Sequence, residues 1–240
     1  MQFVVKRDIL LKSLNFVQGV VEKKNTLPIL SNVLLQIKDK KLSIIATDLD
    51  IIFYDEITEI KVINEGSTTT SAAILYDILR KISSNSDLNF NLKSENKLSL
   101  KSDNSDFNLL CLPTDNFPTF ADEFENREIT LNKGRFLKLL NKTRISISND
   151  DTRHYLNGVF LHITEANGQN FLTGVATDSH RLSSSSLEIN NAEEFKSLIL
   201  PRKTVFQLST LLTEIQGELL MQTSENKIKF SLGNTKLISK

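Results

Sequence analysis

The sequence is poor in the features that disulfide-bonded, secreted and membrane proteins need. Its only cysteine is Cys111, so an internal disulfide is excluded and the residue is expected to be a small apolar side chain in a strand. No apolar run approaches the roughly 20 residues of a membrane-spanning helix. The N-terminal Met1–Lys6 has the pattern of a strand and not of a signal peptide. We therefore expect a cytoplasmic globular protein without a membrane partner.

Residue patterns for catalysis and for metal binding are also missing. The histidines His154, His162 and His180 lack metal-ligand spacing with a cysteine or with a second close histidine. No glycine-rich phosphate loop is present. The residue types of a catalytic triad occur in Asp178-Ser179-His180, but neighbours on one strand cannot converge as a triad does. The sequence therefore predicts a protein that is not an enzyme and that has no catalytic residue, metal or cofactor.

A segment that occurs twice organises the chain. The residues Ala46-Thr47-Asp48 reappear as Ala176-Thr177-Asp178 at an offset of 130 residues, and Leu30–Leu35 matches Leu156–Leu161 at an offset of 126. The four additional residues fall near Glu165–Asn170, a polar stretch that predicts a longer turn. A repeat of this length is a repeat of a whole domain and not of a solenoid unit.

Each copy has the pattern of two helices and several short strands. Leu10, Leu14 and Val17 recur at helical spacing after Asp8, which is a candidate cap of that helix. A second helix is expected over Ala72–Ile82, and Ile51–Ile63 is expected to be one long strand. In the second copy, Asn132 is the candidate cap of the first helix. The predicted fold class is α+β, with repeated domains that each pack two helices on antiparallel sheets.

A proline-containing acidic stretch separates the two copies. Pro113–Glu125 shows no periodicity and contains two of the four prolines. The predicted organisation is a first domain over residues 1–120, a linker over 121–127 and a second domain over 128–240. Both domains lie within the usual size range of a folded domain.

The charges are distributed unevenly although the chain has no formal net charge. Twelve basic and three acidic residues lie in the four windows expected to be helical, which are Lys6–Glu22, Ala72–Ile82, Lys133–Arg144 and Pro201–Leu212. The strands and loops therefore have the opposite excess. If the helices share one face, that face is positive and suits a polyanion. Ordinary solvated helix faces would explain the same composition, and charge alone leaves both interpretations open.

Several longer segments resemble the bacterial DNA sliding clamp, the beta subunit of DNA polymerase III. They occur in the family's order along the chain, and they include Thr26–Asn32, Ala46–Leu49, Asn116–Pro118, Arg153–Gly158, Ala176–Leu182 and Pro201–Lys203. The resemblance implies a domain of two helices backed by antiparallel sheet, with the helices lining a hole around duplex DNA. It covers the first two of the family's three domains, so we expect a third domain to be absent from this chain.

The function implied by the resemblance is that of a processivity factor. A closed ring cannot leave a duplex sideways, so it raises the effective concentration of a tethered polymerase. The implied partners are duplex DNA bound without sequence preference, the alpha subunit of DNA polymerase III, the clamp loader and other proteins with clamp-binding motifs. The alternative is a protein-interaction module with no role on DNA.

The resemblance also implies two sets of site residues. The family's DNA contacts correspond to a set of basic and aromatic residues: Lys24, Arg153, His154, Tyr155, Arg202 and Lys203. The family's cleft for partner peptides corresponds to a second set: Arg153, Leu156, Thr177, His180, Arg181 and Leu182. Ser179 replaces the family's usual glycine. For Asp178 we expect only a turn-capping role, because Asp48 has the same place in the other copy.

Assembly is implied as well. In the family, two three-domain chains form a ring in which the first domain of one chain meets the third domain of the other. The edge strand of the first domain corresponds to Phe107–Leu112, with Phe107, Leu109 and Leu110 as candidate contacts. Full-length members are homodimers, whereas we expect a chain of two domains to remain a monomer or to form only a weak, concentration-dependent dimer.

Overall fold

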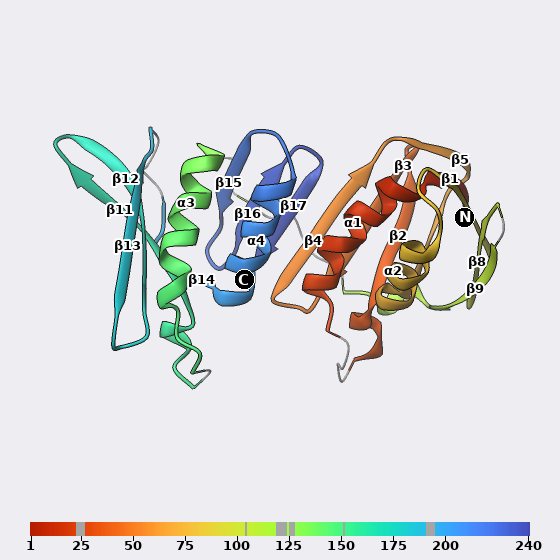
Figure 1. The fold of residues 1–240 in the computed structure, drawn as a ribbon, viewed down its shortest axis with the longest axis horizontal. Coiled ribbons are helices and arrows are strands. Elements are labelled where there is room, and N and C mark those ends of the chain that lie inside the picture. Colours follow the sequence, from red (N-terminus) through yellow and green to blue (C-terminus); the bar gives the residue numbers. More distant parts are fainter. Residues whose placement is uncertain (23–26, 104, 119–123, 125–127, 151, 191–194) are drawn as a thin grey trace. The chain divides into compact units, whose positions relative to one another are not determined.

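The computed structural model describes residues 1–22, 27–103, 105–118, 124, 128–150, 152–190 and 195–240. The chain divides into two compact units. Unit 1 comprises Met1–Ala121 with Asn234–Lys236, and unit 2 comprises Asp122–Gly233 with Leu237–Lys240. The fold class is α+β, as the sequence predicted, and each unit contributes two helices and antiparallel sheet (Figure 1).

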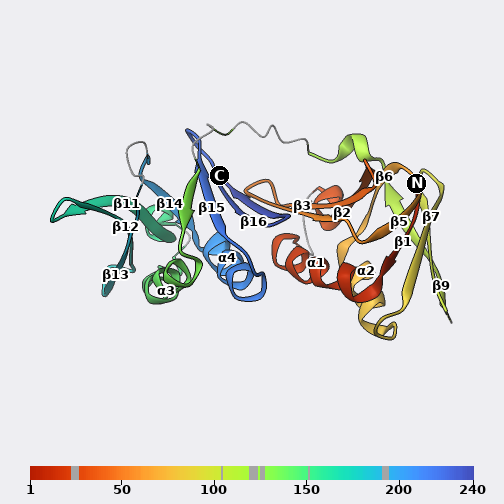
Figure 2. The ribbon, with the colours of Figure 1, turned by 90° about the horizontal axis from the view of Figure 1, so that it is seen from above.

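Unit 1 places its two helices on one side of a continuous run of strands (Figure 2). The helices are α1 (Arg7–Val20) and α2 (Ala72–Lys81), and 3-10 turns cover Pro28–Ser31 (η1) and Thr114–Asn116 (η2). The strands are β1 (Gln2–Lys6), β2 (Asn32–Lys38), β3 (Lys41–Thr47), β4 (Ile51–Ile57), β5 (Ile60–Asn64), β6 (Gly66–Ser71), β7 (Asp87–Ser94), β8 (Lys97–Ser102) and β9 (Ser105–Leu112). They pair in the order β4-β3-β2-β6-β9-β8-β7-β1-β5. Every recorded pairing within the unit is antiparallel.

Unit 2 repeats this plan with two separate sheets. Its helices are α3 (Lys133–Thr143) and α4 (Arg202–Glu214), and its 3-10 turns are η3 (Arg144–Ser146) and η4 (His154–Leu156). One sheet contains β10 (Ile129–Leu131), β15 (Leu219–Thr223), β16 (Ile228–Leu232) and β17 (Thr235–Ser239) in that order. The other has the order β13-β12-β11-β14, formed by β13 (Leu182–Glu188), β12 (Gln169–Thr177), β11 (Gly158–Ala166) and β14 (Leu198–Pro201).

The helices are held on the sheets by the apolar faces that the sequence periodicity predicted. Leu10, Leu14 and Val17 of α1 are fully buried. Each unit contains a stacked pair of phenylalanine rings: Phe3 of β1 on Phe90 of β7 with centroids 4.8 Å apart, and Phe136 of α3 on Phe230 of β16 at 5.7 Å. Such pairs add about 0.5–1.5 kcal/mol to the area that they bury. Each unit therefore has its own core.

The insertion in the second copy lengthens two strands and not the turn between them, so the prediction of a longer turn near Glu165–Asn170 was wrong. Strands β2 and β3 have 7 residues each, whereas β11 and β12 have 9 each. Both hairpins close with two left-handed residues, Asp39-Lys40 and Asn167-Gly168. Because Asn-Gly fits the tight turn that matches strand twist, the ladder continues to the pair Ala166↔Gln169.

Two further expectations about local structure need correction. The stretch Ile51–Ile63 is not one strand: β4 pairs with β3, and β5 pairs with β1 at the other end of the strand order. Asp8 does not cap α1, because the helix begins at Arg7 and Asp8 lies inside its first turn. The carboxylate of Asp8 instead accepts from the Asn85 N–H at 2.7 Å.

Two other local expectations are confirmed. Asn132 caps α3, with its Oδ1 accepting from the Arg135 N–H at 3.0 Å. Cys111 is 5% exposed within β9, and burial raises the pKa of its thiol. A buried thiol with a raised pKa is a small apolar side chain and not a reactive group.

Candidate nucleic-acid interface

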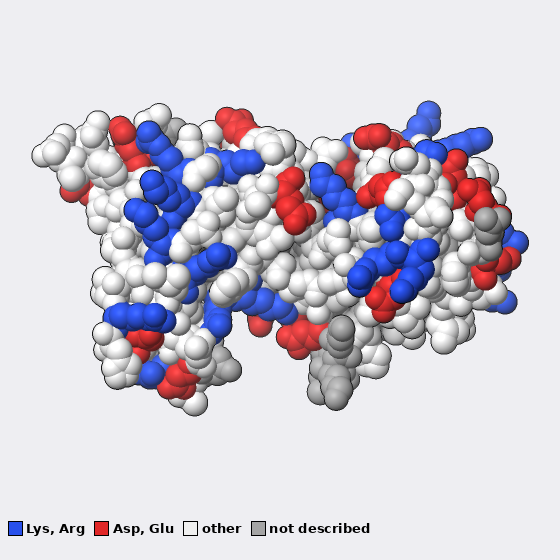
Figure 3. All heavy atoms as spheres, in the orientation of Figure 1, with Lys and Arg blue, Asp and Glu red and all other residues white. Residues whose placement is uncertain are grey.

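A row of basic side chains follows the exposed face of α3. Arg135, Lys138 and Lys142 recur every three or four residues, so they lie on one side of the helix, and all three are exposed. Phe136, Leu139 and Leu140 are buried on the other side. Within the described part of the chain, no ion pair to an acid is recorded for the three cations. Figure 3 shows Lys and Arg side chains gathered over this part of unit 2.

The first turn of α4 is the second basic element of unit 2. The helix begins with Arg202 and Lys203, its first turn contains no acidic residue, and Pro201 at the N-cap supplies no side-chain hydrogen bond. A positive side chain at a helix N-terminus opposes the helix dipole by about 0.3–1 kcal/mol. This end of α4 is therefore better suited to binding an anion than to stabilising the helix.

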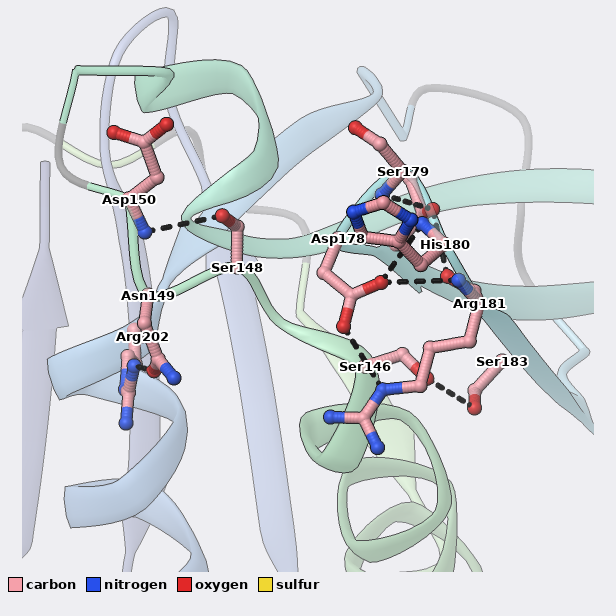
Figure 4. A network of polar contacts seen from close by, with 11 residues as sticks. Ser146, Ser148, Asn149, Asp150, Asp178, Ser179, His180, Arg181, Ser183 and Arg202 are labelled. Carbon is pink, nitrogen blue, oxygen red and sulfur yellow. Dashed lines mark hydrogen bonds and ion pairs between the residues drawn. The ribbon is translucent and has the colours of Figure 1, made fainter.

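The loop before strand β11 contributes the remaining candidates for DNA contact. Arg153 precedes η4 and its Nε donates to the Asp150 carboxylate at 2.9 Å. His154 and Tyr155 follow in η4, both exposed, and the Tyr155 side chain is 68% accessible. Arg202 donates from its guanidinium to the Asn149 side-chain carbonyl in the same loop (Figure 4). The structure thus brings Arg202 beside the loop that carries Arg153, His154 and Tyr155.

The helices of unit 1 present a weaker positive face than the sequence suggested. Arg7 is held inward, where its Nε donates to the Leu79 carbonyl at 2.7 Å and its guanidinium pairs with Asp8 at 2.6 Å. Lys6 pairs with Asp87 at 2.8 Å. Lys24, the one DNA-contact candidate in this unit, lies outside the described residues. The count of basic residues in the helical windows therefore overstates the positive charge that unit 1 presents.

The turn from Thr177 to Leu182 is stabilised by its own side chains. The Thr177 hydroxyl donates to the Arg181 carbonyl at 2.7 Å, and Asp178 Oδ1 accepts from the N–H groups of His180 and Arg181, each at 3.0 Å. In unit 1, Thr47 and Asp48 make the same bonds, with Thr47 donating to the Ile51 carbonyl at 2.8 Å. The expectation that Asp178 caps the turn is confirmed.

Arg153 connects this turn to the loop before β11. Its guanidinium donates to the Ser179 hydroxyl at 2.9 Å, so the residues from the two segments lie side by side. His180 and Arg181 are exposed and Leu182 is 65% accessible, whereas Leu156 and Thr177 are half-buried. The arrangement offers apolar surface at Leu182 with cationic and hydroxyl groups around it, which suits a short peptide.

The third position of both turns has a left-handed backbone, with φ of 85° at Leu49 and 78° at Ser179. This conformation costs a side-chain-bearing residue about 1–2 kcal/mol. We predict that Leu49→Gly raises the free energy of unfolding by about 0.5–1 kcal/mol, since glycine's greater freedom when unfolded offsets part of the relief. The gain from Ser179→Gly is smaller, because the bond from Arg153 is lost. Urea titration of both variants measures this, and a loss of stability in Leu49→Gly would contradict it.

Acid is expected to weaken the 177–182 turn. Hydrogen bonds from the N–H groups of Arg181 and His180 and from the Arg181 side chain hold the pKa of Asp178 below its ordinary value of 3.8. A lowered folded-state pKa gives stability that is present above pH 3.8 and is lost as pH falls through the folded value. Asp178→Asn should therefore be less stable than the wild type at pH 7, and the difference should shrink below pH 4.

Denaturation at several pH values measures this difference. Arg181→Gln is the matched control: it keeps both backbone bonds to Asp178 and removes only the guanidinium, so its effect should be smaller. A difference between Asp178→Asn and the wild type that stays constant from pH 7 to pH 3 would contradict the assignment.

Strand β9 of unit 1 pairs with a different neighbouring strand over each part of its length. It pairs with β8 from Ser105 to Leu110, whereas the recorded pairing with β6 is confined to Cys111 and Leu112. Leu110 is 84% exposed and Phe107 is half-buried, but the Leu109 side chain is only 4% exposed. Of the three candidate contacts, Leu110 presents the most surface and Leu109 belongs to the core.

Sequence reasoning did not single out Arg135, Lys138 and Lys142 as site residues. Their spacing on one helix face was the available signal, since three basic residues at helical periodicity opposite an apolar stripe predict an exposed positive row. Arg144 was also counted only as a charge. No sequence pattern indicated that it would lie beside Phe206 of another helix, with its Cζ 5.4 Å from the ring centroid.

Family comparison divides the chain at the same region as the fold does. The N-terminal domain of the DNA polymerase III beta subunit matches residues 1–121. The central domain of the same subunit matches residues 130–240.

Individual relatives agree with the family match. The chain is 36% identical over 243 residues to the beta sliding clamp of Caulobacter vibrioides (strain NA1000 / CB15N), covering 100% of this chain and 65% of the relative. It is 35% identical over 240 residues to the Escherichia coli (strain K12) beta sliding clamp, covering 64% of it. The chain therefore spans about 65% of the length of such relatives.

Solved structures give the same result at the level of the backbone. The structure described as Caulobacter crescentus pol III beta superposes with a TM-score of 0.95 at 35% identity, covering 100% of this chain and 65% of that one. The clamp of Bartonella birtlesii bound to griselimycin superposes with a TM-score of 0.94 at 36% identity, covering 100% of this chain and 64% of that one.

Proposed function

Because the chain belongs to the family of bacterial sliding clamps formed by the DNA polymerase III beta subunit, we propose that it is the part of a processivity factor that lies against duplex DNA. The family is non-catalytic. The proposed organisation is a first domain over 1–120, a linker over 121–127 and a second domain over 128–240. The proposed assembly is the ring-shaped homodimer of full-length family members, and the proposed location is the cytoplasm.

The observation that carries this proposal is the positive helix face of unit 2. It combines the exposed row on α3 with Arg202 and Lys203 at the start of α4. Contacts from Lys and Arg to phosphate oxygens position a protein on a duplex without reading its sequence. Such contacts are compatible with sliding, because every base pair presents the same phosphates. Encirclement then keeps the protein on the DNA although each contact is weak.

Binding of the 240-residue chain to short duplexes tests the DNA role. We expect weak binding at low salt, with equal affinity for two duplexes of unrelated sequence. The logarithm of the binding constant should fall linearly with the logarithm of the salt concentration. In the control, an uncharged polymer that gives the same viscosity replaces the added salt, so that the ionic strength stays low. Absence of binding at low salt would contradict the DNA role and favour the protein-interaction module.

The second part of the proposal is a peptide site at the 177–182 turn. A peptide with the clamp-binding motif of a polymerase would lay its apolar side chains on Leu182 and Leu156, with Arg153, Thr177, His180 and Arg181 around it. DNA polymerase III alpha, the clamp loader and other clamp-binding proteins are the proposed sources of such peptides. Charged and hydroxyl groups at the rim fix the orientation of a peptide more than its affinity.

A nuclear magnetic resonance titration with such a peptide tests this site. The largest amide shifts are expected from Thr177 to Leu182. Leu182→Ser should weaken binding about ten- to hundredfold, since burial of a leucine side chain contributes about 1.5–3 kcal/mol. Leu110→Ser, at an exposed leucine of unit 1 (84% against 65% for Leu182), is the control. Shifts elsewhere and none in this turn would contradict the proposed site.

Assembly through β9 is the last part of the proposal. An edge strand with free backbone groups can pair with a strand of another chain, and the exposed Leu110 would lie in that contact. The partner edge in the family belongs to a third domain, so the 240-residue chain by itself is expected to sediment at micromolar concentration as a monomer or as a weak, concentration-dependent dimer. A stable closed dimer of this chain would contradict that assignment of the partner edge.

A further inference from the structure

Two arginines from different helices of unit 2 lie against one aromatic ring. Arg144 follows α3 as its C-cap, and its Cζ lies 5.4 Å from the centroid of the Phe206 ring. Arg202 is the first residue of α4, and its Cζ lies 5.7 Å from the same centroid. Phe206 is 40% exposed, one turn into α4. The three side chains therefore form a single surface cluster at the junction of α3 and α4.

The cluster holds positive charge that no recorded acid neutralises. Among the described residues, neither Arg144 nor Arg202 has a recorded ion pair, and the one recorded side-chain hydrogen bond of Arg202 goes to the neutral Asn149 amide. Two like charges held near one ring repel each other, and Arg202 also opposes the dipole of α4. An anion between or beside the two guanidinium groups would remove both costs.

We propose that Arg144, Phe206 and Arg202 form one phosphate-binding unit, in which Phe206 is a positioning residue and Arg144 is a phosphate contact additional to Arg202. The proposal rests on the proposed function in that the phosphate belongs to duplex DNA. A guanidinium group binds a phosphate through two parallel N–H bonds, and such bonds need a fixed group orientation. The ring supplies that orientation, because a guanidinium is attracted to an aromatic face.

The arrangement also explains why an aromatic side chain lies exposed on a helix that otherwise presents polar residues outward. A free arginine loses side-chain freedom when it binds, and two arginines already held against a ring lose less. Phe206 would thus raise affinity without touching the DNA. The contact carries no base information, which agrees with a duplex bound in any register.

A role confined to folding is the alternative, because Arg144 at the C-terminus of α3 also complements that helix dipole. The two roles predict different results for stability and for DNA binding. A folding role changes the free energy of unfolding and leaves the salt dependence of DNA binding unchanged. A phosphate role changes the salt dependence, because each lost phosphate contact lowers the slope of log K against log salt by about 0.9.

The experiment compares three variants with matched controls. Arg144→Gln should lower the salt slope by about one. Phe206→Leu should leave the salt slope unchanged and weaken binding about two- to fivefold for each arginine that loses its contact with the ring. Phe206→Tyr keeps an aromatic ring and should bind DNA as the wild type does. The controls are Phe160→Leu, a strand phenylalanine with the same 40% exposure, and Lys61→Gln, an exposed lysine of β5. Both should bind as the wild type does.

A second probe separates this proposal from the DNA role. Inorganic tripolyphosphate is titrated while the arginine Nε resonances are observed by nuclear magnetic resonance. Shifts at Arg144 and Arg202 that Phe206→Leu weakens support the cluster, even for a chain that binds no duplex. If the chain binds DNA but Arg144→Gln and Phe206→Leu change neither probe, the cluster is overturned and the DNA role stands. If the chain binds no duplex DNA and tripolyphosphate shifts neither arginine, both the cluster and the DNA role are overturned.

Discussion

Replacing Gly158 by alanine is expected to lower the free energy of unfolding of unit 2 by about 2–3 kcal/mol, which is large for the addition of one methyl group. A Cβ at Gly158 would lie 2.4 Å from the Leu200 carbonyl oxygen and 2.7 Å from Ile199 Cγ2. The first neighbour is backbone, so strand β14 must move away from β11. Since β14 leads directly into α4, the change also displaces Arg202 and Lys203.

Gly134→Ala is the matched control for this stability measurement. Its Cβ would meet only the Asn132 side chain, at 3.7 Å, inside the first turn of α3. Alanine in a helix is about 0.5–1 kcal/mol more favourable than glycine, so this variant should be more stable than the wild type. Urea denaturation measures both. Equal stability of Gly158→Ala and Gly134→Ala would contradict the close packing of β11 on β14.

The double variant Arg202→Gln/Lys203→Gln is expected to lower the salt slope of DNA binding by about two, because two phosphate contacts are lost at about 0.9 each. Glutamine keeps most of the side-chain length, so the helix start is little disturbed. Affinity should fall equally for duplexes of unrelated sequence. Fluorescence anisotropy at a series of salt concentrations gives the slope directly.

The control for the double variant removes the same charge elsewhere. Lys61→Gln/Lys93→Gln changes two exposed lysines on strands β5 and β7 of unit 1. Net charge falls by the same amount, so a general electrostatic effect would appear in both variants. A slope that changes equally in the two, or in neither, would remove Arg202 and Lys203 from the interface.

Most of the architecture could be predicted from the sequence because the internal repeat shows the same pattern of helices and strands in both halves of the chain. The Ala-Thr-Asp segment identified equivalent turns, and the two turns have the same bonds around Asp48 and Asp178. The cap at Asn132 could be predicted because a cap depends on neighbouring residues alone. These features are local, and local sequence determines them.

The features that could not be predicted depend on partners that are distant in the sequence. Asp8 accepts from the Asn85 N–H and not from a backbone N–H of its own helix, and Arg7 is held by the Leu79 carbonyl and by Asp8. The count of charges therefore overestimated the positive charge that α1 presents. Ile51–Ile63 divides because its two halves pair with different strands, β3 and β1. Phe206 of α4 lies beside Arg144, which directly follows α3. Periodicity carries no information about such pairings.

We propose that duplex DNA lies on the helix face of unit 2 and not on its strands. Amide shift mapping of the labelled chain with a short duplex at low salt tests this most directly. Shifts are expected along the exposed face of α3, in η4 and at the first turn of α4, around Lys138, Tyr155 and Lys203. Shifts concentrated instead on the outward residues of β11 and β12, with none on α3 or α4, would contradict it.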